Sequence, residues 1–217
     1  MSIATLVIGE SGTGKSTSMR NLPVAETLLI QTVKKPLPFR SPDWRRFDKQ
    51  ACPSGNVFAT DNSQRIVELM HKTRRPIIVV DDFQYLLANE YMRRSDEKGY
   101  EKFTDIGRHA WDVLSAASQL GEQTRVYILA HSTTDDFGRT RAKTIGKLLD
   151  EKITVEGLFS IVLRTVVRDG AYLFATKNNG QDTTKTPIGL FDDDLIDNDL
   201  AAVDASICEY YELTTTE

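Results

Sequence analysis

A glycine-rich segment near the start of the chain restricts the fold more than any other part of the sequence. Residues 9–16 read GESGTGKS and match the phosphate-binding loop pattern G-x-x-x-x-G-K-[ST]. An apolar run over residues 3–8 precedes the loop, and residues 17–22 after it can form a helix that Pro23 ends. The motif requires a strand, a glycine loop and a helix in this order. The pattern therefore predicts a site for a nucleoside triphosphate, which we take to be ATP.

Each residue type in the loop has an expected role. Glycines allow backbone N–H groups to converge on phosphate oxygens without Cβ clashes, and the N-terminus of the next helix adds partial positive charge. Lys15 is expected to reach the β- and γ-phosphates, and the Ser16 hydroxyl to ligate Mg²⁺. The residues expected to contact the nucleotide are Gly9, Glu10, Ser11, Gly12, Thr13, Gly14, Lys15, Ser16 and Thr17.

A second apolar run supplies carboxylates for the metal. Residues 76–82 read PIIVVDD, and four consecutive aliphatic residues are typical of a strand buried on both faces. Asp81 stands at the carboxyl end of this strand, where open parallel sheets bind ligands, and is assigned to Mg²⁺ directly or through water. Two roles are open for Asp82, because it could polarise the attacking water or cap the helix that begins near Phe83.

A third strand with a polar end is expected over residues 125–132, which read RVYILAHS. In P-loop ATPases with an additional strand between the two Walker strands, a polar side chain at this point senses the γ-phosphate. His131 and Ser132 are the candidates. A histidine at a strand end can equally be a structural residue with satisfied hydrogen bonds.

Composition and charge indicate a globular chain with an uneven charge distribution. The 217 residues are 40% apolar, no apolar run approaches the roughly 20 residues of a membrane span, and the first strand leaves no room for a signal peptide. Cys52 and Cys208 match no zinc spacing, which favours a reducing, cytoplasmic setting. Residues 192–217 hold nine acids and no Lys or Arg, whereas residues 1–191 hold 27 basic and 22 acidic residues.

This asymmetry predicts an ATPase core over residues 1–191 and an acidic helix or tail over residues 192–217. An acidic tail can compete with nucleic acid for a basic body or recruit a partner such as a single-strand-binding protein. The alternative is a solvated terminal helix with one apolar face. The residues spaced for that face are Leu195, Leu200, Val203 and Ile207.

The remaining pattern predicts an α/β fold with a mostly parallel central sheet flanked by helices. Apolar runs at strand length alternate with segments of helical spacing, such as the one over residues 103–117. Two β-rich runs, over residues 159–167 and 171–176, flank the sequence Arg-Asp-Gly, and Asp-Gly between such runs signals an antiparallel hairpin. The sheet is therefore expected to end in a C-terminal hairpin.

The order of these parts resembles the core of the RecA/RadA recombinases. The segment TKNN over residues 176–179 resembles the lysine–asparagine element that follows the last hairpin strand in that family. There the lysine reaches the γ-phosphate of a neighbouring subunit, which implies a catalytic role for Lys177 and a homo-oligomeric ring or filament. Lys185 is a second, less closely matching lysine.

More narrowly, the chain resembles phage-encoded, core-only RecA-like ATP-binding proteins of single-strand annealing recombination. The resemblance implies ATP hydrolysis, binding of single-stranded DNA, promotion of annealing, and action in the cytoplasm of a bacterial host. One departure concerns the catalytic Glu that RecA-like ATPases place after the second strand, because residues 31–35 here read QTVKK. Turnover is therefore expected to be slow, or Asp82 to substitute.

The same resemblance indicates two loops as DNA contacts, over residues 89–98 and 132–147. Basic side chains in flexible loops can follow a DNA backbone, with Tyr91 or Phe137 available for base stacking, although most such loops are only solvated polar segments. The basic residues concerned are Arg93, Arg94, Arg139, Arg141, Lys143 and Lys147.

Three other functions compete with this interpretation. One is a helicase-loader or protein-remodelling ATPase, although that class carries a helical lid with a sensor arginine where this chain is acidic. Another is a small-molecule kinase, in which the 132–147 loop would act as a lid. The last is a nucleotide-gated binding module with negligible turnover.

Overall fold

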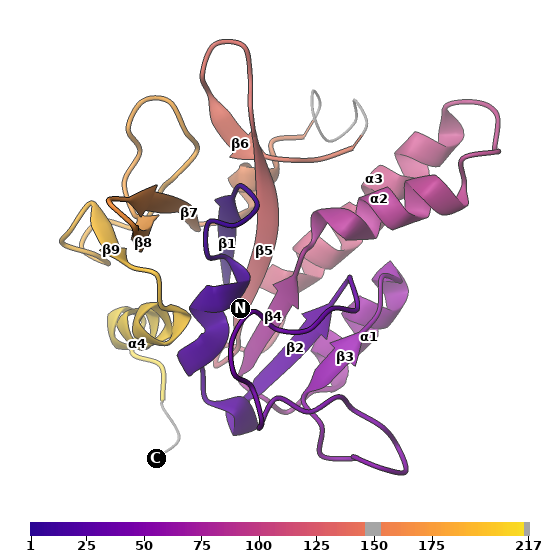
Figure 1. The fold of residues 1–217 in the computed structure, drawn as a ribbon, viewed down its shortest axis with the longest axis horizontal. Helices are drawn as coiled ribbons and strands as arrows, with labels where there is room; N and C mark the ends of the chain where they lie inside the picture. The colour runs from indigo at the N-terminus through magenta and orange to yellow at the C-terminus, as the bar shows by residue number, and fades with distance from the viewer. Residues whose placement is uncertain (146–152, 215–217) are drawn as a thin grey trace.

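The computed structural model describes residues 1–145 and 153–214 and contains a nine-stranded sheet between two layers of helices (Figure 1). The strands are β1 (Ile3–Gly9), β2 (Thr27–Gln31), β3 (Val57–Ala59), β4 (Ile77–Asp81), β5 (Arg125–Thr134), β6 (Thr140–Ala142), β7 (Ile161–Arg168), β8 (Ala171–Ala175) and β9 (Leu195–Asp197). The helices are α1 (Ser63–Lys72), α2 (Gln84–Arg93), α3 (Glu101–Ser118) and α4 (Leu200–Tyr210), with 3-10 helices η1 (Ser16–Asn21), η2 (Val24–Glu26) and η4 (Val155–Leu158).

The strand order places three polar strand ends side by side. The sheet runs β3-β2-β4-β5-β1-β7-β8-β9, with β6 paired to β5, so that β5 separates β1 from β4. Gly9 at the end of β1 pairs with His131 of β5, and Gln31 at the end of β2 pairs with Asp81 of β4. All of these pairings are parallel, so the carboxyl ends meet at one edge, as the sequence predicted.

Alternating side chains along the central strands form two separate apolar layers. Leu6 and Ile8 of β1 face α1, α2 and α3, whereas Val7 faces η1 and α4. Such runs, apolar on both faces, are what a parallel sheet covered on both sides requires. The predicted α/β class with a mostly parallel, helix-flanked sheet is therefore confirmed.

The predicted hairpin is also present. Strands β7 and β8 are antiparallel, and the turn between them has positive φ angles of 52° at Asp169 and 78° at Gly170. Two consecutive positive φ angles suit the tight hairpin turns that Asp-Gly favours. Strand β9 extends this antiparallel part of the sheet.

Two local expectations need correction. The helix after the glycine loop is a 3-10 helix of six residues, which adds much less dipole than a full α-helix would, because its aligned peptides are few. The segment expected as a loop over residues 89–98 is helical as far as Arg93, because α2 continues to that residue.

The acidic C-terminal segment is part of the fold as far as it is described. Leu200, Val203 and Ile207 of α4 are buried in the layer that also contains Met19 and Leu22 of the η1 region. Three of the four residues expected on the apolar face of a terminal helix therefore lie on α4. The fourth, Leu195, lies on β9 instead of on the helix. Among the described residues, no helix has the length and apolar character needed to cross a membrane.

Candidate nucleotide-binding site

The glycine loop between β1 and η1 has a backbone that requires glycine at three positions. Gly12 and Gly14 have φ angles of 79° and 95°, in the left-handed region where side chains are disfavoured. At Gly9 a Cβ atom would lie 1.8 Å from the Thr165 hydroxyl of β7, so any side chain would separate the two strands. Thr13 and Thr165 share a hydrogen bond of 2.5 Å that fastens the loop to β7.

Lys15 lies inside the loop, with only 6% of its surface exposed. Its Nζ donates hydrogen bonds to the carbonyl oxygens of Gly9 at 2.8 Å and Glu10 at 2.6 Å. Burial lowers the pKa of Lys15 to about 8, against the opposing effect of Asp82 and Asp81. A cation held this way by neutral carbonyl groups would gain from a phosphate anion in the same place.

Ser16 and Asp81 meet below the loop. The Ser16 hydroxyl donates a 2.8 Å hydrogen bond to Oδ1 of Asp81, whereas Oδ2 of Asp81 is buried without a hydrogen-bond partner. Burial, together with the neighbouring Asp82, raises the pKa of Asp81 to about 6. An orphaned carboxylate oxygen beside a serine hydroxyl fits a divalent cation that also binds substrate oxygens and water.

No group of three or more His, Cys, Asp or Glu residues that could hold a metal ion occurs in the described part of the chain. The residues present therefore suit Mg²⁺ that arrives with a nucleotide, in which phosphate oxygens supply the remaining ligands.

Asp82 occupies an unusual position next to this pair. It is buried and has a φ of 60°, a left-handed conformation that few non-glycine residues adopt. Its carboxylate forms an ion pair with Lys35 and lies 3.7 Å from Nε2 of His131. Burial alone would raise the pKa of Asp82, but His131 and Lys35 outweigh burial and lower it. Phe83 is the N-cap residue of α2 and has no side-chain cap hydrogen bond, whereas the backbone carbonyl of Asp82 accepts from the Tyr85 N–H at 2.9 Å; the catalytic role of Asp82 stays a prediction.

These groups surround a pocket of about 300 Å³, at the lower end of the usual range for ligand sites. The pocket brings together the P-loop, the end of β4 and the end of β5, as expected. Lys35, Pro36, Pro38 and Tyr172 were not predicted to belong to it. Its lining residues are Ser11, Gly12, Gly14, Lys15, Ser16, Thr17, Lys35, Pro36, Pro38, Asp82, His131 and Tyr172.

A signal for Lys35 was available in the sequence. Strand β2 is parallel to β4, so the residues that follow both strands emerge at the same edge of the sheet. No comparable signal exists for Tyr172, because its approach to Gly14 depends on how β8 crosses the loop.

Lys177 lies outside the pocket of its own chain. Its Nζ is 2.8 Å from the Asp194 carboxylate and donates to the carbonyl oxygen of Asp192 at 2.9 Å. Lys185 exchanges backbone hydrogen bonds with Val162 of β7. The expected contact of Lys177 with a neighbouring subunit stays a prediction.

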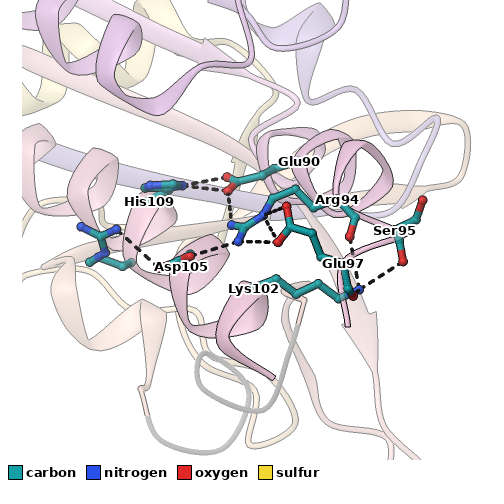
Figure 2. A network of polar contacts seen from close by, with 8 residues as sticks. Glu90, Arg94, Ser95, Glu97, Lys102, Asp105 and His109 are labelled. Carbon is teal, nitrogen blue, oxygen red and sulfur yellow. Dashed lines mark hydrogen bonds and ion pairs between the residues drawn. The ribbon is translucent and has the colours of Figure 1, made fainter. Parts of the chain in front are cut away.

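The first pair of expected DNA contacts is bound to carboxylates. Arg93 forms an ion pair with Asp61 at 2.6 Å. Arg94 lies in a polar network between α2 and α3, where it pairs with Glu90, Glu97 and Asp105 at 2.8–3.1 Å (Figure 2). The charge of both arginines is therefore largely compensated within the chain.

The second group lies on the β5–β6 hairpin, which rises beyond the sheet (Figure 1). Arg139, Arg141 and Lys143 are exposed there, and Lys147 lies outside the described residues. At the tip of the hairpin, Phe137 is 88% exposed, whereas Tyr91 packs against Phe103 in the helical layer.

Together, the glycine loop, the paired carboxylates and the additional strand between β1 and β4 define the fold of a P-loop NTPase. No family model matches the sequence, and no curated protein matches it. A comparison with solved structures finds the genome packaging NTPase B204 from Sulfolobus turreted icosahedral virus 2 in complex with ATP-gammaS. The two share 10% identity with a TM-score of 0.41, over 83% of this chain and 94% of that one. The strand order and the glycine loop of this chain are what identify the P-loop NTPase fold.

The raised pKa of Asp81 predicts a stability that depends on pH in the nucleotide-free protein. A folded-state pKa of about 6, above the ordinary value of 3.8, makes the folded state bind the proton more tightly. The contribution of Asp81 to stability is then fully present below about pH 4 and is lost as the pH rises through 6. Asp81→Asn removes this loss, and we expect it to raise the free energy of unfolding at pH 7.5 by about 1–3 kcal/mol.

Urea unfolding at pH 5 and pH 7.5, without nucleotide or Mg²⁺, measures this effect. The exposed Asp112 of α3 provides a matched control, because Asp112→Asn should leave stability unchanged at both pH values. Equal stability of wild type and Asp81→Asn at pH 7.5 would contradict the expected cost of this buried carboxylate.

Proposed function

We propose that the protein binds and slowly hydrolyses ATP with Mg²⁺, and that ATP binding controls its contact with single-stranded DNA during annealing and recombination. The observation that carries the nucleotide part is the Ser16–Asp81 hydrogen bond, with an orphaned carboxylate oxygen, beside the Lys15 loop. A ligand with both phosphate and a divalent cation would satisfy all three groups at once.

Different residues of the pocket would bind the phosphates, bind the cation and orient the attacking water. Lys15 and the loop N–H groups hold the phosphates, while Ser16 and Asp81 hold the cation. When bound, Mg²⁺ neutralises charge that develops on the transferred phosphoryl group. Asp82 is the candidate for orienting the attacking water, because its carboxylate lines the pocket, and its lowered pKa makes it a weak base. Its ion pair with Lys35 limits that role, which accords with slow turnover.

The DNA part of the proposal is supported by the β5–β6 hairpin. The hairpin begins directly after His131, which pairs with Gly9 of the phosphate loop. Its exposed cations and the exposed Phe137 ring provide backbone neutralisation and base stacking, the two components of sequence-independent single-strand binding. We extend the proposal to a homo-oligomer in which Lys177 contacts a neighbour's nucleotide, and to a single-strand-binding protein as partner of the acidic segment.

Fluorescence anisotropy of a labelled single-stranded oligonucleotide, with and without ATP-Mg²⁺ at several salt concentrations, tests the DNA part. We expect ATP-enhanced binding whose logarithmic salt dependence has a slope near −3, equivalent to about four neutralised phosphates. Arg139→Ala/Lys143→Ala should weaken binding and reduce the slope by about 1.4. The matched control, Arg65→Ala/Lys72→Ala, removes two cations from α1 on another face and should leave the slope unchanged.

Two outcomes contradict this part of the proposal. If both double variants reduce binding equally, the hairpin has no particular role. If ATP binds but DNA does not bind in any condition, a protein-remodelling ATPase or a kinase becomes the better interpretation.

A further inference from the structure

Lys35, in the segment that follows β2, reaches into the nucleotide pocket. It follows β2 by four residues and lines the pocket with Lys15 and Ser16. Its side chain is 41% exposed, whereas its partner Asp82 is only 5% exposed. Lys35 is therefore the more mobile member of this ion pair, and it is positioned at the mouth of the site.

Hydrogen bonds and a proline fix the backbone around Lys35, whereas its partly exposed side chain can move. The side-chain amide of Gln31 donates to the carbonyl oxygen of Lys35 at 3.2 Å. Pro36 follows directly and restricts the preceding residue to an extended conformation. Thr32 donates to the carbonyl oxygen of Asp82 at 2.7 Å, which fastens the start of this segment to the end of β4. The ammonium group can thus change partner while the segment that carries it stays in place.

The position of the ion pair indicates which phosphate Lys35 can reach. Asp82 is the neighbour of Asp81, the residue that fits a cation bridging the β- and γ-phosphates. Lys35, Asp82 and His131 line the same pocket as the glycine loop, and we place the terminal phosphate beside these three residues because they lie next to the expected cation ligand Asp81. The Lys35 ammonium group is the exposed half of this pair, so it can turn from the carboxylate to a more highly charged phosphate, while His131 stays beside Asp82.

We propose that Lys35 binds the terminal phosphate of a bound nucleoside triphosphate, leaves Asp82 when it does so, and gives the site its preference for triphosphate over diphosphate. This inference rests on the proposed nucleotide function. A diphosphate has no γ-phosphate, so Lys35 stays on Asp82. With a triphosphate, the Asp82 carboxylate keeps its contact with His131 and becomes available to water. Lys35 thus links occupancy of the γ position to release of Asp82.

Isothermal titration with Mg²⁺-ATP-gammaS and with Mg²⁺-ADP tests this role without relying on turnover. Lys35→Ala should raise the Kd for ATP-gammaS about 10-fold, as expected for loss of a charge-assisted hydrogen bond, and change the Kd for ADP less than about 2-fold. Lys35→Arg, which keeps the cation, should retain part of the preference. The adjacent, exposed Lys34 does not line the pocket, so Lys34→Ala should change neither affinity.

A second variant tests the exchange of partners. Asp82→Asn removes the competing carboxylate and should tighten ATP-gammaS binding while leaving ADP binding unchanged. The inference is overturned if Lys35→Ala melts at the wild-type temperature and weakens the binding of ATP-gammaS and ADP equally. It is also overturned if this variant weakens the binding of neither nucleotide. By contrast, wild-type protein that binds neither nucleotide would refute the proposed function itself.

Discussion

Lys15→Ala is expected to abolish nucleotide binding, raising the Kd for Mg²⁺-ATP by about 100-fold or more, the effect of losing several charge-assisted hydrogen bonds at once. Lys15 is the buried cation of the loop, and its Nζ already lies among the oxygens of Gly9 and Glu10. Because burial lowers its pKa, the protein holds this charge at some cost in the absence of phosphate. Removing the lysine should therefore eliminate binding without lowering the stability of the nucleotide-free chain.

Thermal unfolding with and without Mg²⁺-ATP provides the measurement. Ligand at 100 times its Kd stabilises a folded protein by about 2.7 kcal/mol, so wild type should melt higher with ATP. Lys15→Ala should melt at the same temperature with and without ATP. Lys49→Ala, a change in an exposed lysine outside the pocket, should behave as wild type. An ATP-induced shift of wild-type size in Lys15→Ala would refute the site.

Asp204→Ala is expected to cost about 3–5 kcal/mol of stability, because it leaves a buried arginine without its partner. Arg125 of β5 donates two hydrogen bonds, of 3.0 and 2.9 Å, to the Asp204 carboxylate on α4, and Tyr127 donates a third of 2.6 Å. Arg125 is buried, so water cannot replace the lost carboxylate. A loss of this size is a large part of the 5–15 kcal/mol that stabilises an ordinary domain.

Urea unfolding of wild type, Asp204→Ala and two further variants separates the effect of the Arg125–Asp204 pair from general effects of removing acidic charge. Asp197→Ala changes an exposed carboxylate on β9 and should cost little. The triple variant Arg125→Met/Tyr127→Phe/Asp204→Leu removes every polar member of the group and should recover most of the stability. Asp204→Ala and Asp197→Ala of equal stability would contradict the role assigned to α4.

The loop and the strands around it could be predicted because their signals are local. The spacing of Gly9, Gly14 and Lys15 fixes a strand, a turn and the start of a helix within a few residues. The aliphatic runs that end at Asp81 and His131 require burial on both faces, and parallel packing then brings their ends together. Ser16 and Asp81 meet as that reasoning predicts.

The ion pairs of the charged residues could not be predicted, because composition does not show which oppositely charged residue lies beside each of them in the fold. Arg94 looks like a DNA contact in the sequence, but three carboxylates from neighbouring turns surround it. The acidic excess after residue 191 indicates a solvated tail, yet Asp204 is buried against Arg125, about 80 residues earlier in the chain. Asp82 can only be distinguished from a helix cap once Lys35 and His131 are seen beside it.

Both outer strands of the sheet, β3 and β9, are only three residues long. A strand of another chain placed along either one could form only two or three ladder hydrogen bonds, too few to extend the sheet from molecule to molecule. Short edge strands of this kind oppose amyloid-like growth at high protein concentration. Copies of this protein that associate would therefore gain little from pairing along β3 or β9, and side-chain surfaces are the expected contacts.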